Sequence, residues 1–391
     1  MLADPIVIVA AARTPMGGFL GALGGCPAPR LGAIAIEAAV ARAGIAGEAV
    51  DEVLMGNVLS AGLGQAPARQ AALGAGLPQA VPCTTISKVC GSGMKAVMLA
   101  HDMIVAGSAG IVVAGGMESM SNAPYLLDRA RAGYRLGHGR TLDHMFLDGL
   151  EDAYEKGRLM GAFAEDTAQR LGFTRKMQDD YALASLERAK TAIASGAFDE
   201  EIAPVKLGEA MVSVDEQPGK ARPDKIPQLK PAFHPQGTVT AANSSSISDG
   251  AAALLLMRRS QAESRGLTPL AAIVAHAGQA RAPADFTTAP VGAVEALMRK
   301  AGWRLDEVDL FEINEAFAVV ALAAMRELSL PHDKVNVNGG ACALGHPIGA
   351  SGARILVTLL AALRRRGLRR GVATLCIGGG EATAVAVERI A

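Results

Sequence analysis

The chain has 391 residues, of which 50% are hydrophobic, 4% are aromatic and 45 are glycine. This length exceeds one compact domain, and the composition excludes a disordered chain and favours an α/β protein in which small aliphatic residues pack closely. Acidic and basic side chains balance at 38 each, so no overall charge attracts nucleic acid or an anionic membrane.

The N-terminal segment begins with a predicted buried strand. Residues 6–9 are β-branched and precede a glycine-rich stretch at 17–25. This start is unlike a signal peptide, and no apolar run is expected to reach membrane-spanning length, so a cytoplasmic protein is predicted. The glycines do not follow a strand with the G-x-G-x-x-G spacing of a nicotinamide dehydrogenase.

The cysteines also indicate a reducing compartment. They are odd in number, widely spaced and without a C-x-x-C pair, which disfavours a disulfide framework or a zinc site. The cysteines are Cys26, Cys83, Cys90, Cys342 and Cys376.

The two ends of the sequence repeat each other in the same order. A-G at 43–44, followed by V-D-E-V at 50–53, matches A-G at 301–302, followed by L-D-E-V at 305–308. C-G-S-G at 90–93 matches A-S-G at 350–352, and V-V-A-G-G-M-E at 112–118 matches L-C-I-G-G-G-E at 375–381. An ordered echo of this length predicts a duplicated α/β domain.

Cys90 lies at the first candidate site. Residues 84–89 are strand-like and residues 94–100 are helix-like, so this cysteine is predicted at a strand-to-helix turn. Unpaired N–H groups and the helix dipole there favour a thiolate and donate to an oxyanion, and Gly91 and Gly93 let the backbone approach a substrate. The alternative is an inert buried cysteine beside a tight turn.

Between the repeated ends, residues 121–248 look like an insertion. This segment is richer in Arg, Asp, Tyr and Pro, and it has loop-like stretches at 133–140 and 217–235. One amphipathic helix is predicted at about 178–194.

Three more candidate residues lie in the second half. Asn314 follows a strand-like segment, His346 lies in a glycine-dense loop before a helix with one apolar face, and Cys376 ends an apolar strand. The alternatives are a helix N-cap for Asn314, a structural loop histidine and another buried thiol. An arginine run at 364–370 is predicted to be a solvated helix end.

Taken together, these segments resemble the thiolase family over the whole chain. The matching motifs are C-G-S-G-M-K-A from Cys90, G-G-M-E-S-M-S at 115–121, N-E-A-F-A from Asn314, G-H-P-I-G-A-S-G-A-R at 345–354 and C-I-G-G-G from Cys376. The resemblance implies an α/β thiolase fold, in which two βαβαβαββ halves stack as a five-layer α-β-α-β-α sandwich. The first half is then 1–120, completed by about 249–270, the inserted loop domain that binds CoA is 121–248, and the second half is 271–391.

The same resemblance implies an acetyl-CoA C-acetyltransferase, which condenses two acetyl-CoA molecules reversibly to acetoacetyl-CoA and CoA. Cys90 would carry the acetyl group after His346 removes its proton, and Cys376 would act as base in condensation and acid in cleavage. Two oxyanion holes are implied, one from His346 with a water held by Asn314, and one from the backbone N–H groups of Cys90 and Gly378.

CoA contacts are implied at Ser245, Met160 and Phe317. The chain reads L-M-G at 159–161, where biosynthetic relatives usually read H-M-G, and no pocket methionine is evident near 283–286. Chain length and tolerance of a 2-methyl branch therefore stay open. No cofactor besides the CoA thioesters and no metal are predicted, and family relatives imply a homo-oligomer, either a dimer or a tetramer.

Several alternatives use the same residues. A degradative 3-ketoacyl-CoA thiolase would differ only in pocket shape, and a non-catalytic thiolase-like lipid carrier would be expected to lose the catalytic motifs that are intact here. A ketosynthase would show two histidines, or His and Asn, rather than His346 with Cys376. A papain-like hydrolase does not fit the duplication. The physiological direction stays open.

Overall fold

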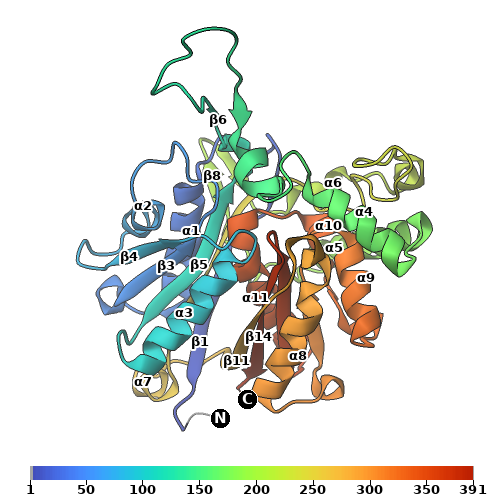
Figure 1. Cartoon of the computed structure of the whole chain (residues 1–391). Helices are drawn as coiled ribbons and strands as arrows, with labels where there is room; N and C mark the ends of the chain where they lie inside the picture. Colours follow the sequence, from blue (N-terminus) through green and yellow to red (C-terminus); the bar gives the residue numbers. More distant parts are fainter. Residues whose placement is uncertain (1–2, 391) are drawn as a thin grey trace.

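The structure is a computed structural model that describes residues 3–390. A large mixed sheet forms its framework (Figure 1). In sheet order, the strands of the first half are β1 (Ile6–Arg13), β10 (Ser248–Arg258), β5 (Val112–Ser119), β3 (Glu52–Gly56) and β4 (Cys83–Ile86), with the short β2 (Gly17–Gly18) beside β10. Those of the second half are β11 (Ala271–Ala280), β14 (Glu381–Arg389), β13 (Arg370–Ile377) and β12 (Leu310–Ile313).

The two halves share one strand order. Each places its first strand beside its last, and the halves meet where β1 and β11 pair through Val7 with Ala272 and Ile8 with Ala271. The counterpart of β4 in the second half is reduced to an isolated parallel bridge between Phe311 and Val335. The repeated order confirms the duplicated fold.

Helices separate and cover these strands in five layers. The helices of the first half are α1 (Ala28–Ala43), α2 (Pro67–Gly74), α3 (Ser92–Ala106) and α7 (Arg259–Ser264), and those of the second are α8 (Ala289–Ala301), α9 (Ala318–Glu327), α10 (Ala341–Leu344) and α11 (Ile348–Arg365). α1 and α2 cover one outer face, α8 and α9 cover the other, and α3 packs on α11 in the middle (Figure 1).

The repeated A-G segments end corresponding helices in the two halves. Gly44 ends α1 with a φ of 65°, and Gly302 ends α8 with a φ of 67°. Both glycines are in the left-handed conformation that commonly ends a helix. A short 3-10 turn follows in each half, Gly47–Ala49 before β3 and Leu305–Glu307 before β12.

The two central helices differ from expectation in their burial. α11 is buried on nearly all sides rather than on one apolar face, because strands of the first half lie on one side of it and strands of the second half on the other.

The window Val89–Ala106, which contains α3, is long and apolar enough to cross a membrane by length and composition. This finding corrects the expectation that no apolar run reaches that length. Half of that window is buried, and α3 packs on β5 and α11, so core packing accounts for its apolar residues.

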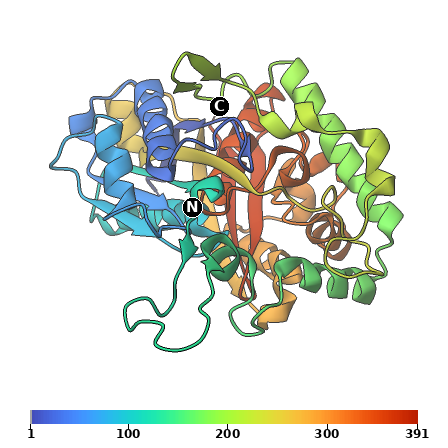
Figure 2. The same ribbon diagram turned by 90° about the horizontal axis from the view of Figure 1, so that it is seen from above.

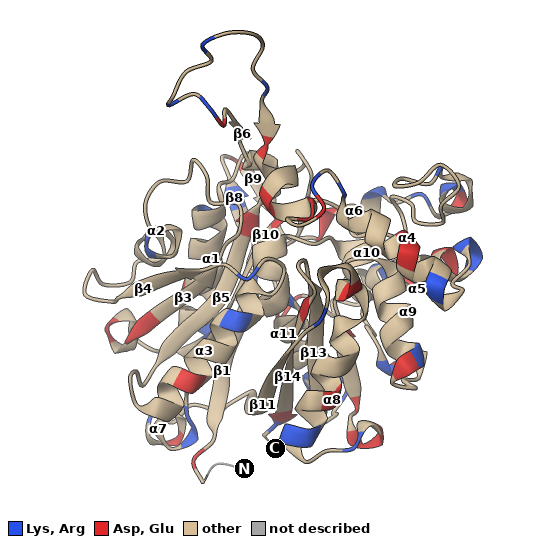
Figure 3. Ribbon diagram, viewed as in Figure 1, with Lys and Arg blue, Asp and Glu red and all other residues tan. Residues whose placement is uncertain are grey.

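The segment between β5 and β10 forms the predicted insertion. Its elements are β6 (Tyr125–Leu126), β7 (Leu142–Asp143), a π-helix (Phe146–Leu150), α4 (Met160–Leu171), α5 (Arg175–Ala194), β8 (Val205–Leu207), β9 (Ala210–Val212) and α6 (Glu216–Lys220). Seen from above, α4 and α5 lie beside the second half, and the loop between β6 and β7 projects from the body (Figure 2). That loop is exposed and rich in arginine (Figure 3).

A buried ionic cluster ties this insertion to the first strand. Arg13 on β1 is fully buried, and its guanidinium lies 2.7 Å from Asp215 and 3.3 Å from Glu201. Both carboxylates belong to the inserted segment. Moving the insertion away from the sheet would leave these buried charges without their partners, which is energetically costly. The ionic cluster therefore fixes the insertion on the sheet.

Candidate active site

Cys90 lies in a strained turn between β4 and α3. Val89, which precedes it, has a φ of 46°, a conformation that β-branched residues avoid. The buried Ser92 hydroxyl holds the turn, since it donates to the carbonyl of Val89 (2.7 Å) and accepts the N–H of Lys88 (2.8 Å). The side chain of Cys90 is therefore held at one fixed point.

The surroundings of Cys90 oppose its ionisation. The N–H groups of Gly91 and Ser92 already donate to the carbonyls of Lys88 and Val89, at 3.0 Å each. Burial raises the pKa of Cys90 to about 11, although the backbone N–H groups of Gly378 and of Cys90 itself donate to the sulfur. Cys90 is a thiol at neutral pH, so it needs a base to become a nucleophile.

The glycines next to Cys90 lie where neighbouring segments pack closely. A Cβ added at Gly91 would lie 2.4 Å from a side chain at the end of β13, and one at Gly93 would lie 3.0 Å from the carbonyl of Gly349 on α11. From the other side, a Cβ at Gly352 would lie 2.5 Å from the nitrogen of Met94 on α3. The two helices thus approach backbone to backbone, which brings their first turns together.

His346 precedes α11 and is 6% exposed. Its Nδ1 lies 2.5 Å from the hydroxyl of Ser351, and that hydroxyl lies 2.9 Å from the carbonyl of Pro347. When the hydroxyl donates to the carbonyl, it accepts the Nδ1–H of the ring, and Nε2 is left as the basic nitrogen. Nε2 is buried and has no hydrogen-bond partner among residues 3–390.

The imidazole of His346 is neutral. Burial lowers its pKa to about 3, and the charge of Arg354 contributes in the same direction. Arg354 is itself fully buried, and its guanidinium lies 3.7 Å from Glu312 on β12. A neutral ring with one unpaired nitrogen is the form that can accept a proton.

Asn314 contacts this histidine. Its Nδ2 lies 3.4 Å from Nδ1 of His346, and its Oδ1 lies 3.4 Å from the guanidinium of Arg354. α9 begins at Ala318 with Phe317 at the N-cap position, so the N-cap alternative for Asn314 is excluded. The fully buried amide instead fixes one side of the His346 ring.

The end of β13 brings the second cysteine to the first. Cys376 is buried beside Phe286 and Phe317, and burial raises its pKa, with a further contribution from the charge of Cys90. The N–H of Gly378 donates to the sulfur of Cys90. Cys90, Cys376 and Gly378 therefore meet at one place, whereas no hydrogen bond joins Cys90 to His346 in the described chain.

The predicted CoA contacts lie on one side of this site. The sulfur of Met160, at the start of α4, would lie 3.3 Å from a Cβ at Gly378. Ser245 donates its N–H to the carbonyl of Ala316 (2.9 Å), and Phe317 is the next residue. A surface cavity of about 460 Å³ opens beside Met160, and Leu159 lines it. That volume is in the range of small-molecule sites.

Two contacts escaped sequence reasoning. Ser351, whose role was not assigned, bonds His346 from five residues away. Glu118 is fully buried, and its carboxylate accepts the N–H groups of Val58, Leu59 and Gly349, the last in the first turn of α11. Both residues lie in recognised motifs, but only the folded chain shows which groups they contact.

Residues 6–260 match the family model described as thiolase, N-terminal domain, and residues 267–389 match that described as thiolase, C-terminal domain. The chain is 51% identical to the acetyl-CoA acetyltransferase of Cupriavidus necator, and 52% identical to that of Escherichia coli, in each case over 98% of this chain and 99% of the relative. It is 52% identical to acetyl-CoA acetyltransferase 2 of Arabidopsis thaliana, over 98% of this chain and 96% of that protein.

Proposed function

Because the chain belongs to the thiolase family, we propose that it is an acetyl-CoA acetyltransferase, which joins two acetyl-CoA molecules reversibly into acetoacetyl-CoA and CoA. The observation that carries this proposal within the molecule is the meeting of two thiols, Cys90 and Cys376, at a backbone N–H donor, Gly378. Two thiols suit two half-reactions, one that transfers an acetyl group and one that moves an α-proton.

In the first half-reaction, the sulfur of Cys90 attacks the carbonyl carbon of acetyl-CoA, and Nε2 of His346 takes the thiol proton. Burial raises the pKa of Cys90 and lowers that of His346, so the two groups are neutral before substrate binds. As the sulfur attacks, the negative charge appears on the carbonyl oxygen. The C–S bond to CoA then breaks, and the CoA sulfur recovers the proton.

In the second half-reaction, the thiolate of Cys376 removes a proton from the α-carbon of a second acetyl-CoA. The resulting enolate attacks the acetyl carbon on Cys90, the new C–C bond forms, and the sulfur of Cys90 leaves and takes up the proton that Cys376 had removed. Negative charge on Cys90 raises the pKa of Cys376. Acetylated Cys90 cannot carry a negative charge, so it does not oppose ionisation of Cys376 at the step that requires a base.

Backbone and side-chain donors are available for both oxyanions. The N–H groups of Cys90 and Gly378 are directed at the sulfur of Cys90, next to the position of a thioester oxygen. His346, together with a water held by Asn314, is proposed to serve the other thioester oxygen, and Nε2 of His346 donates there once it carries a proton. Ser245, Met160 and Phe317 are proposed to contact CoA.

A steady-state assay tests the substrate class. The purified protein is supplied with CoA and, in turn, acetoacetyl-CoA, 3-ketohexanoyl-CoA or 2-methylacetoacetyl-CoA, and loss of the ketoacyl absorbance is followed. We expect the highest kcat/KM for acetoacetyl-CoA and no turnover by Cys90→Ala. A preference for 3-ketohexanoyl-CoA would instead support a degradative thiolase. This is the second candidate because the cavity wall carries the apolar Leu159. A cytoplasmic homo-oligomer stays a prediction.

A further inference from the structure

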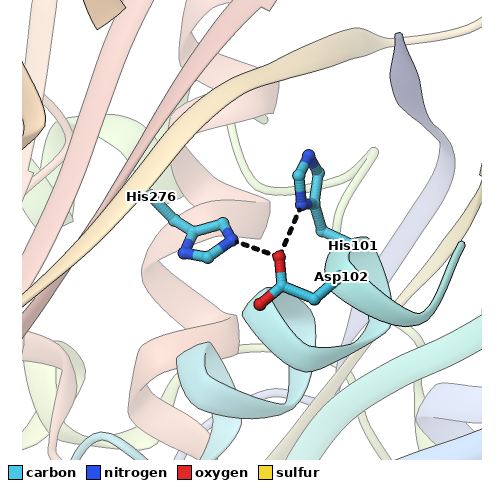
Figure 4. A group of neighbouring side chains, drawn as sticks. All are labelled: His101, Asp102 and His276. Carbon is cyan, nitrogen blue, oxygen red and sulfur yellow. Dashed lines mark hydrogen bonds and ion pairs between the residues drawn. The ribbon is translucent and has the colours of Figure 1, made fainter. Parts of the chain in front are cut away.

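Outside the candidate active site, three side chains with metal-binding atoms meet between the two halves of the fold. His101 and Asp102 extend from α3, His276 extends from β11, and both imidazole rings are directed at the carboxylate (Figure 4). Oδ1 of Asp102 lies 3.1 Å from Nδ1 of His101 and 2.8 Å from Nε2 of His276. These three atoms all lie within 4.8 Å of one another.

We propose that His101, Asp102 and His276 form a binding site for a divalent transition-metal ion such as Zn²⁺. Two imidazole nitrogens and one carboxylate oxygen form a ligand set used by three-residue zinc sites, in which water completes the coordination. Ligand atoms around a tetrahedral zinc ion are separated by about 3.3 Å. The separations from Oδ1 to the two nitrogens are slightly shorter, so small rotations of the two rings make room for the ion.

Charge and exposure suit a cation. The carboxylate supplies one negative charge, and neutral imidazole is the commonest metal ligand among side chains. The side chains of His101 and His276 are 13% and 16% exposed, and that of Asp102 is 51% exposed, so an ion and its waters can reach the cluster. The ammonium of Lys300 donates to the backbone carbonyl of His276 (3.1 Å), and this contact engages one of its N–H groups outside the three ligand atoms.

The position of the cluster gives the ion a structural role. α3 belongs to the first half and begins two residues after Cys90, whereas β11 is the first strand of the second half. The two half-sheets pair directly through only two residue pairs of β1 and β11. An ion held by α3 and β11 adds a connection between the halves at the end of α3 remote from Cys90, and it stabilises the folded state without contacting the reacting groups.

Zinc binding by chelator-treated enzyme tests this site. Calorimetry with Zn²⁺ measures stoichiometry and affinity, and the melting temperature is recorded with and without the ion. We expect one ion per chain and a higher Tm, with affinity at least tenfold weaker in His101→Gln and in His276→Gln. His138→Gln, which alters an exposed loop histidine, is the matched control and should bind as wild type does.

Cys90→Ala separates this site from the catalytic thiols, which also attract zinc, and it should retain the ion. Cluster variants should keep wild-type thiolysis of acetoacetyl-CoA, which shows that they are folded. If a histidine variant does not fold, Asp102→Asn, which keeps the side-chain shape, replaces it. The proposal is overturned by a wild type without a saturable zinc site, by unchanged affinity in the cluster variants, or by loss of the ion in Cys90→Ala.

Discussion

At the residue scale, Cys90 and His346 form a neutral pair in the resting enzyme. Burial opposes charge on both groups, with pKa values of about 11 for the thiol and about 3 for the imidazole. A thiolate–imidazolium pair is therefore not preformed, unlike the pair in proteins whose cysteine is activated by an adjacent cation. Because the thiolate is the reactive form of cysteine, a protonated Cys90 is less prone to oxidation in the free enzyme.

Ser351 contacts the proposed base, His346. Ser351→Ala removes the acceptor of the His346 Nδ1–H, so the tautomer with a basic Nε2 is no longer favoured. We expect kcat for acetoacetyl-CoA thiolysis to fall by about 10-fold to 100-fold, as for other residues that orient a reacting group, with little change in KM. Ser351→Thr keeps the hydroxyl and should restore most of the activity. Equal losses in the two variants would contradict an orienting role.

Burial of His346 also predicts a dependence of stability on pH. Above pH 6.5 the ring is neutral in both the folded and the unfolded chain, and as the pH falls only the unfolded chain takes up the proton, because the folded pKa is about 3. Stability is therefore lost between about pH 6.5 and pH 3. Urea unfolding at pH 7 and pH 5 should show that wild type loses about 2 kcal/mol more than His346→Gln. Equal losses would mean that the folded protein protonates this ring readily.

Sequence motifs predicted the candidate catalytic residues but not the protonation state of the Cys90 thiol. Cys90 lies at a strand-to-helix turn as predicted, yet its thiol is protonated because the nearby N–H groups bond to carbonyls and the site is buried. Local sequence cannot report this desolvation, which is imposed by residues far away along the chain. Local sequence also cannot report that His101 and Asp102 meet His276, since Asp102 and His276 are 174 positions apart.

At the element scale, the contact between α3 and α11 positions the site. Both helices begin next to candidate catalytic residues, and their glycines let the backbones touch. The distance between these first turns is set by the absence of side chains at Gly93 and Gly352. The repeated segments predicted two equivalent helices. They did not predict that these helices pack on each other, because a sequence repeat does not show which element a helix face contacts.

Gly352→Ala tests this contact. The added Cβ would lie 2.5 Å from the backbone nitrogen of Met94, so one helix must move. We expect a loss of about 1–3 kcal/mol in stability from overpacking, together with a large fall in kcat as the first turns separate. Gly219→Ala is the matched control, since no atom lies within 4 Å of its added Cβ and its φ is not positive. Wild-type activity in Gly352→Ala would show that the spacing of the helices is not critical.

At the scale of the whole molecule, the insertion is held to the sheet by buried charge. Arg13→Ala leaves Asp215 and Glu201 without their cation, which should destabilise the protein by about 3–5 kcal/mol in urea unfolding. Arg304→Ala breaks a fully exposed pair with Asp306 and should change stability little. Similar effects of the two variants would contradict the role of the buried cluster.

The overall architecture was the most predictable level. Ordered repeats at the two ends predicted the duplication, and the change in composition after 120 predicted the insertion, because both are written in contiguous sequence. The ion pairs of Arg13 were not predicted, since its partners lie about 200 residues away and carry no local signal.

The central claim is that Cys90 carries the acetyl group between two CoA thioesters. Mass analysis of the protein after mixing with acetyl-CoA tests it most directly, with peptide mapping to locate the modification. We expect one acetyl group per chain on Cys90, its loss when CoA is added, and its absence in Cys90→Ala. An unmodified Cys90, or an acetyl group that maps to Cys376 instead, would contradict the mechanism.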